Sequence, residues 1–168
     1  MIMNIRLAGM IPNSLNNGEG IRKVIFAQGC RHKCKGCFNP ETHDFNGGEL
    51  FDVEEIIKEI NDDYMIDGVT FSGGDPIEQA EAFAYIAKNI NKELTVWCYT
   101  GYTFEYLLEW SKHDVNIKEL LNNIDVLVDG RFEIEKLSTQ CKFRGSTNQR
   151  LVDVVESLKQ GKFIEYKI

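Results

Sequence analysis

The sequence predicts an α/β fold on a mostly parallel sheet, because short apolar strands alternate with amphipathic helices along the chain. Four such alternations can be traced, and parallel strands joined by helices need right-handed crossovers. The 168 residues fall short of the roughly 250 typical of a closed eightfold barrel, so we expect a partial barrel or an open sheet. No internal repeat, low-complexity tract or linker divides the sequence, which favours one domain over residues 1–168.

The first strand and the first helix of this alternation follow from local patterns. The apolar run KVIFAQ predicts a strand at 23–28. Apolar residues then recur every three or four positions over 53–60, which predicts an amphipathic helix. Asp52, followed three residues later by Glu55, forms a capping-box start. We therefore expect this helix to begin directly after Asp52.

The alternation continues through the rest of the chain. GVTF at 68–71 predicts a buried strand, and Asp75 and Pro76 then open a second helix with proline at its first position. Two further strands are expected at 94–99 and 124–128, with a helix between them at 103–110. The tail at 150–168 stays open, because LVDVVESL fits either a β-branched strand or a helix.

Charge and hydropathy exclude several classes of function. The 26 Asp and Glu outnumber the 19 Lys and Arg, and the net charge of -7 makes a phosphate backbone an unfavourable partner, so we expect no nucleic acid. No run approaches the roughly 18 apolar residues of a membrane span. The opening MIMNIRLAGMIPNS lacks both a long apolar core and a small-residue cleavage site. We therefore expect a cytoplasmic protein with no membrane contact.

Three of the five cysteines crowd into eight residues. Cys30, Cys34 and Cys37 have the spacing C-x3-C-x2-C directly after the first predicted strand, at the carboxyl end where α/β active sites gather. An odd number of cysteines is an awkward disulfide framework, whereas this cluster is a natural set of metal ligands. Three thiolates on a [4Fe-4S] cluster leave one iron free for an exogenous ligand, so this set favours catalysis.

A structural zinc site is the alternative for the same cysteines. Five residues separate Cys37 from His43, so the pattern C-x3-C-x2-C-x5-H would supply a closed Cys3His site. His32, between the first two cysteines, is interpreted as a solvated loop residue and not as a ligand. The next strand end favours catalysis, because FSGGDP places a second functional loop on the same rim of the sheet. A structural zinc site would not need that loop.

The second loop, Gly73-Gly74-Asp75, has two interpretations. In the first, the glycines let a ligand approach the backbone closely, and Asp75 offers a carboxylate to a cationic group. In the second, the glycines form a tight turn and Asp75 caps the following helix. The two interpretations are compatible with each other.

The two loops together resemble those of the radical S-adenosylmethionine (SAM) enzymes, whose signature is C-x3-C-x2-C with a Gly-Gly-Glu loop or a variant of it. Within that superfamily, the sequence is most similar to the family of anaerobic ribonucleoside-triphosphate reductase-activating proteins. The matching stretches are NGEGIR at 17–22, CRHKCKGCFN at 30–39, FSGGDP at 71–76, YTGY at 99–102, DVLVDGRF at 125–132 and FRGSTNQR at 143–150. The resemblance implies a partial (β/α) barrel of the radical SAM type.

The resemblance also implies a chemistry and its cofactors. Cys30, Cys34 and Cys37 would ligate a [4Fe-4S] cluster, and SAM would chelate the fourth iron through its amino and carboxylate groups. Reductive cleavage of SAM would give a 5′-deoxyadenosyl radical, which takes hydrogen from a glycine of the partner, an anaerobic ribonucleoside-triphosphate reductase. A reduced flavodoxin-type protein would donate the electron. The cofactor-binding residues implied in this way are Gly36, Cys37, Phe38, Gly73, Gly74 and Asp75.

Two related activities and several single residues stay open. One activity is that of a radical SAM enzyme acting on a small molecule, similar to 7-carboxy-7-deazaguanine synthase, although no residue set for a pterin stands out. The other is the activation of a different glycyl-radical enzyme such as pyruvate formate-lyase, although those chains are usually longer. Asp129 and Arg144 are candidates either for cofactor contacts or for roles in the fold. Cys98 is expected to be a buried apolar residue and Cys141 to be incidental.

Overall fold

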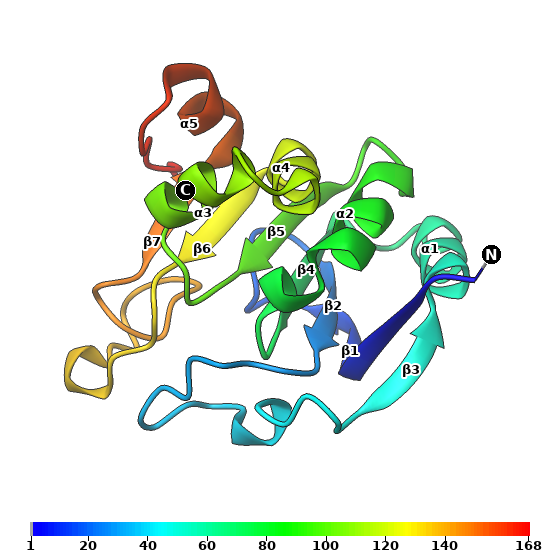
Figure 1. Ribbon diagram of the computed structural model, residues 1–168, viewed down its shortest axis with the longest axis horizontal. Coiled ribbons are helices and arrows are strands. Elements are labelled where there is room, and N and C mark those ends of the chain that lie inside the picture. Colours follow the sequence, from blue (N-terminus) through cyan, green and yellow to red (C-terminus); the bar gives the residue numbers. More distant parts are fainter. Residues whose placement is uncertain (1) are drawn as a thin grey trace.

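The computed structural model describes residues 2–168, which form a seven-stranded sheet with helices packed along one face (Figure 1). The strand order is β3-β1-β2-β4-β5-β6-β7. The central strands run parallel to one another, and they are β2 (Arg22–Ala27), β4 (Gly68–Gly73), β5 (Thr95–Tyr99) and β6 (Val126–Asp129). The flanking strands are antiparallel, and they are β1 (Asn4–Ser14), β3 (Glu49–Asp52) and β7 (Arg150–Asp153). The predicted α/β class with a parallel sheet at its centre is confirmed.

The helices connect or follow the strands. They are α1 (Val53–Asn61), α2 (Ala80–Asn89), α3 (Phe104–Ser111), α4 (Val115–Asn122) and α5 (Val154–Gln160). Short 3-10 turns lie at η1 (Pro40–Thr42), η2 (Pro76–Gln79) and η3 (Ile134–Lys136). The side chains of four residues cap α-helices by accepting first-turn N–H groups, namely Asp52, Thr103, Asp114 and Asp153. Over residues 2–168, none of the helices has the length and apolar character needed to cross a membrane.

The predicted strands and helices of the central alternation are confirmed to within two residues, with one exception. Pro76 opens a 3-10 turn, and the α-helix that was expected there begins only at Ala80. The ambiguous tail contains both candidate elements, since β7 is followed at once by α5. The sequence analysis missed α4 and the antiparallel strands β1 and β3. Strand β1 hides its period because it contains Gly9 and Pro12 and its pairing with β2 is irregular.

The main hydrophobic core lies between the sheet and its helices. Successive side chains of a strand point to opposite faces, so alternate residues of the central strands enter this core. Fully buried examples are Ile25, Phe71, Cys98 and Leu127. The expectation for Cys98 is therefore confirmed, and burial raises the pKa of its thiol well above the usual value. A smaller cluster packs on the opposite face and contains Trp97, Val126, Val128 and Leu151.

A buried arginine joins the amino ends of three parallel strands. Arg22 donates to Thr70 Oγ1 (2.8 Å) and to Val69 O (2.8 Å) on β4, and to Thr95 O (2.7 Å) on β5. Burial lowers the pKa of this guanidinium to about 10. Arg22 thus ties β2, β4 and β5 together at one end of the sheet, and their carboxyl ends lie at the other.

Candidate functional site

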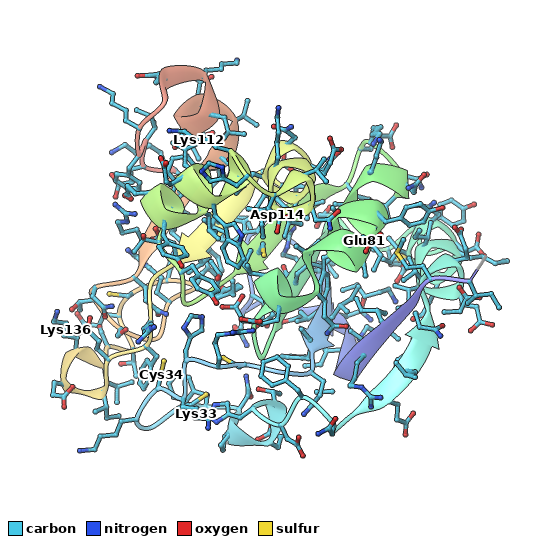
Figure 2. The ribbon with its side chains drawn as sticks, in the orientation of Figure 1. Lys33, Cys34, Glu81, Lys112, Asp114 and Lys136 are labelled. Carbon is cyan, nitrogen blue, oxygen red and sulfur yellow. The ribbon has the colours of Figure 1, made fainter. Side chains whose placement is uncertain are left out.

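A cavity of about 360 Å³ lies at the carboxyl ends of the four parallel strands. All three cysteines of the C-x3-C-x2-C motif line it, and Figure 2 shows Cys34 on the loop that follows β2. The other strands contribute residues at or just beyond their ends, which include 73–74, 100–101 and 130–132. The strand-end positions predicted from the sequence therefore meet in one place. A larger groove of about 820 Å³ adjoins this cavity, and His32 and Arg131 border both.

The loop between β2 and η1, residues 28–39, carries the three cysteines as free thiols and is called the cysteine loop below. Gly36 adopts a φ of +76°, and a β carbon there would lie 2.9 Å from Ile134 Cδ1. The Cys37 N–H donates to Cys34 O (3.1 Å), which closes a turn between two of the cysteines. Burial raises the pKa of the Cys30 thiol to about 11, although the backbone amide of His32 lowers it by hydrogen bonding. Because metal coordination requires thiolates, binding of a metal here releases protons.

The glycines at the end of β4 are required by the neighbouring backbone. Gly73 has a φ of +99°, and a β carbon there would lie 2.4 Å from Ala27 N. At Gly74 a β carbon would lie 2.4 Å from Gly29 O. Gly74 N–H donates to Ala27 O (2.8 Å), and Asp75 N–H donates to Gly29 O (2.9 Å). The two glycines therefore let β4 pack directly against the start of the cysteine loop, and both also line the cavity.

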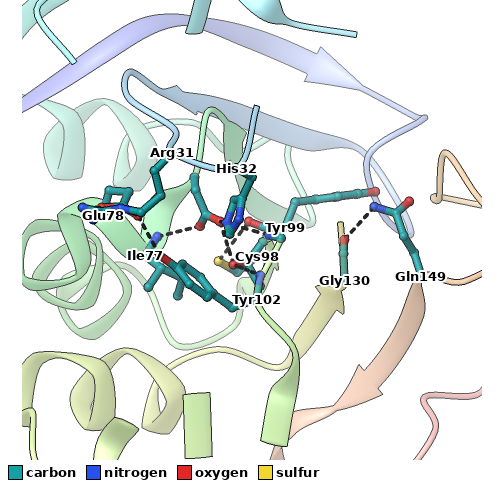
Figure 3. Close-up of polar contacts among 12 residues, drawn as sticks. Arg31, His32, Ile77, Glu78, Cys98, Tyr99, Tyr102, Gly130 and Gln149 are labelled. Carbon is teal, nitrogen blue, oxygen red and sulfur yellow. Dashed lines mark hydrogen bonds and ion pairs between the residues drawn. The ribbon is translucent and has the colours of Figure 1, made fainter. Parts of the chain in front are cut away.

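Asp75 is fully buried, and its carboxylate has four internal hydrogen-bond partners. Oδ1 accepts from Ile77 N–H (3.0 Å). Oδ2 lies 2.7 Å from His32 Nε2, and it accepts from Thr100 Oγ1 (2.9 Å) and Gly101 N–H (3.0 Å) (Figure 3). Three of the four partners therefore share Oδ2, and Oδ1 has one. The capping interpretation is confirmed, and the contact of Asp75 with a cationic group of a cofactor stays a prediction.

The expectation that His32 is solvated is wrong. Its side chain is only 3% exposed, and its ring packs edge-on against Tyr102 with 4.5 Å between the centroids. Since Asp75 accepts from Gly101 N–H at the same oxygen, its carboxylate acts as an acceptor and His32 Nε2 donates. Within residues 2–168, His32 Nδ1 is buried with no hydrogen-bond partner. The local sequence gave no sign of this burial, because Asp75 lies 43 positions further along the chain.

His43 is the fourth ligand that the zinc alternative would require. It lines the same cavity as the cysteines, and its Nε2 is buried with no hydrogen-bond partner among residues 2–168. Over the same residues, no three His, Cys, Asp or Glu side chains form a group that could hold a metal ion. The choice between zinc and iron-sulfur chemistry therefore depends on the relatives of the chain.

Comparisons with known proteins decide between these metals. Residues 16–152 match the family described as a 4Fe-4S single cluster domain. The anaerobic ribonucleoside-triphosphate reductase-activating protein of Enterobacteria phage T4 is 37% identical over 148 residues, covering 83% of this chain and 88% of that one. The protein of the same name from Haemophilus influenzae is 35% identical over 147 residues, covering 82% and 91%. The chain belongs to this family of activating proteins.

Membership of the activating-protein family settles the cofactors. The protein is a radical SAM activase with a [4Fe-4S] cluster and SAM, so the zinc alternative is set aside. Among solved structures, QueE from Escherichia coli aligns with a TM-score of 0.44 at 16% identity, covering 59% of this chain and 53% of that chain.

The three cysteines of the motif in this activating protein can supply the thiolates of such a cluster. Three free thiols line one cavity, and the other two cysteines, Cys98 and Cys141, do not line it. Three protein thiolates leave one iron for an exogenous ligand. Aromatic side chains form part of the wall, since Phe38 packs against Phe132 with 4.8 Å between the ring centroids. Phe38 is nevertheless 66% exposed, so this part of the wall lies at the mouth of the cavity.

Asp129, one of two residues of the activating protein that the sequence left open, has a role in the fold. Asp129 is buried, accepts from Phe104 N–H (2.8 Å) at the start of α3, and pairs with Arg150 Nε (3.0 Å). It does not line the cavity. Arg144 also lies outside the lining, and its Nε donates to Lys142 O (3.2 Å).

Arg131 and Phe132 are among the cavity residues that the sequence analysis did not name as site residues. Both line the cavity, in the loop that follows β6. The strand-end rule that drew attention to Asp129 would have found them, because they lie only two and three positions further along the chain. Arg131 is exposed, so its guanidinium is available to an anionic group at the mouth of the cavity.

Proposed function

We propose that this protein cleaves SAM reductively and thereby forms a glycyl radical on an anaerobic ribonucleoside-triphosphate reductase. The observation that carries this proposal is the meeting of Cys30, Cys34 and Cys37 with the end of β4 around one cavity. When bound, the cluster supplies the electron that breaks a carbon–sulfur bond of SAM, and the 5′-deoxyadenosyl group then takes hydrogen from the partner's glycine. The protein itself binds, orients and excludes water.

The cavity residues divide this work according to their chemistry. Cys30, Cys34 and Cys37 bind three irons of the cluster. Gly73 and Gly74 carry no side chain and so present their backbone to the methionyl group of SAM.

The residues around the last cysteine of the motif would bind the rest of the cofactor. Gly36, Cys37 and Phe38 lie beside the cluster position, and the ring of Phe38 covers one side against water together with Phe132. Arg131 is the cation beside the cavity that can pair with the SAM carboxylate, because charge-assisted hydrogen bonds are the stronger kind. Arg144, the earlier candidate, does not line the cavity.

The proposal includes an electron donor and a compartment. A reduced flavodoxin-type protein supplies the electron, and the reaction takes place in the cytoplasm. Free cysteines at 30, 34, 37, 98 and 141 are consistent with a reducing compartment, where thiols persist.

Anaerobic mixing with the cognate reductase tests this function. The reconstituted protein, a chemical reductant and SAM are incubated with the reductase, and both 5′-deoxyadenosine and the glycyl radical are measured, the latter by electron paramagnetic resonance (EPR). We expect both products from the wild type and from Cys141→Ala, and neither from Cys34→Ala. Formation of 5′-deoxyadenosine without a glycyl radical would instead support the small-molecule alternative. Absence of both from a protein with an intact cluster would reject the proposal.

A further inference from the structure

One buried carboxylate connects three of the loops that form the cavity. Asp75 itself follows β4, Thr100 and Gly101 follow β5, and His32 belongs to the cysteine loop after β2. All of these partners bond to the same oxygen, Oδ2, at 2.7 to 3.0 Å. Figure 3 shows His32 at the centre of this network, between the loop ends. A shift of any one loop would therefore break a hydrogen bond to a fully buried charge.

The imidazole of His32 is held tightly in this position. A β carbon on Gly101 would lie 2.5 Å from His32 Cδ2, so the ring packs directly on the Gly101 backbone. Tyr102 covers the ring edge-on. The preceding residue, Arg31, also reaches the segment after Asp75, because its guanidinium binds both carboxylate oxygens of Glu78. Two consecutive residues of the cysteine loop are thus attached to the connection between β4 and α2.

His32 also lies next to the cluster ligands. It is two positions from both Cys30 and Cys34 in the chain. The residue whose side chain bonds to Asp75 is therefore part of the short segment that carries two of the three cysteines. Asp75 itself is fully buried and does not line the cavity, so its carboxylate does not face the space where SAM would bind.

We infer that His32 and Asp75 are a pair of positioning residues, which hold the cysteine loop against the Gly73-Gly74 turn before any cofactor binds. Asp75 then acts on the cofactor only through His32 and the cysteines. The effect on SAM rests on the proposed function, whereas the fixing of the loop is a property of the chain alone. The two parts can be measured separately.

The test compares three variants of the full chain with the wild type, and Asp75→Asn is measured beside them. His32→Leu removes the donor to Asp75, whereas His32→Gln keeps an Nε2–H group at the same number of bonds from the β carbon. Arg22→Gln is the matched control, because it disrupts a buried network at the opposite end of the same strands, β2, β4 and β5. The first measurement is amide exchange over residues 29–38 in the cluster-free chain. The second is the SAM affinity of the reconstituted protein, obtained by titrating its reduced EPR signal.

We expect His32→Leu to accelerate exchange of the bonded amides in residues 29–38 and to weaken SAM binding, each by about tenfold or more, since it removes a hydrogen bond to a buried charge. We expect His32→Gln to keep both the amide exchange rates and the SAM affinity within about twofold of the wild-type values. Arg22→Gln lowers the melting temperature and leaves both measurements at the wild-type value.

Several results would overturn the inference. If His32→Leu keeps the wild-type exchange rates and the wild-type SAM affinity, the His32–Asp75 pair does not fix the cysteine loop. If His32→Gln and His32→Leu change exchange and SAM affinity equally, the imidazole acts by something other than its hydrogen bond to Asp75. If Arg22→Gln changes them as much, the cause is general destabilisation of the fold. An Asp75→Asn variant that loses SAM affinity with unchanged exchange would place Asp75 in direct contact with the cofactor. If SAM leaves the wild-type spectrum unchanged, the proposed function fails, and amide exchange alone decides whether the loop is fixed.

Discussion

Replacement of Gly73 by alanine tests whether backbone packing requires the glycine at the end of β4. The added β carbon would lie 2.4 Å from Ala27 N and 2.6 Å from Ala27 O, both of which belong to the paired backbone of β2. Neither atom can rotate away as a flexible side chain would. The residue also has a φ of +99°, which L-amino acids rarely adopt.

The expected cost of Gly73→Ala follows from these two effects. Strained backbone at a non-glycine residue costs about 1–3 kcal/mol, and overpacking against a well-packed neighbour costs about 1–3 kcal/mol. Together they lower the free energy of unfolding by roughly 2–6 kcal/mol. For a chain of 168 residues each kcal/mol lowers the melting temperature by about 2–4 °C, so the total fall is roughly 5–20 °C.

Thermal unfolding of the cluster-free chain, followed by circular dichroism, measures this change. The matched control is Gly9→Ala in β1, where a β carbon would meet nothing within 4 Å. We expect the control to melt within about 3 °C of the wild type, since an unstrained Gly→Ala change alters stability by less than about 1 kcal/mol. A Gly73→Ala protein that melts as close to the wild type as the control does would refute the packing argument.

Three further substitutions separate the fold from the cofactor site. Tyr99→Phe removes the hydroxyl that donates to Phe143 O (2.6 Å), so urea unfolding should show a loss of about 1–3 kcal/mol; an unchanged midpoint would contradict this. Asp129→Asn removes the buried charge that pairs with Arg150, and we expect about 1–3 kcal/mol less stability with wild-type SAM affinity, whereas a loss of affinity would return Asp129 to the cofactor site. Cys34→Ala should abolish iron incorporation and the brown colour, and Cys98→Ala should keep both; retained cluster in Cys34→Ala would overturn the ligand assignment.

The parts of the fold that were predictable are those written in short stretches of sequence. The apolar runs of the parallel strands and the spacing of Cys30, Cys34 and Cys37 need only local neighbours to be read. The end of a parallel strand then locates a loop on the rim of the sheet, which is why the two predicted loops do meet at one cavity. Local pattern and topology together were enough to find the candidate site.

The parts that were not predictable depend on contacts between distant residues. The burial of His32 follows from Asp75, 43 positions away, and a histidine between two loop cysteines carries no sign of such a partner. Likewise, a Gly-Gly pair looks the same whether it faces a ligand or a neighbouring strand, and only the pairing of β2 with β4 shows that Ala27 fills the space beside Gly73. The antiparallel strands β1 and β3 were missed because pairing, and not hydrophobic period, makes them strands.

The central claim is that three cysteines hold a cluster with one iron open to SAM. The most direct measurement is the EPR spectrum of the anaerobically reconstituted and reduced protein, recorded before and after SAM is added. The account predicts a [4Fe-4S]+ signal that changes on addition of SAM. A protein that instead holds one zinc and no cluster, or a cluster signal that SAM leaves unchanged, would contradict the account.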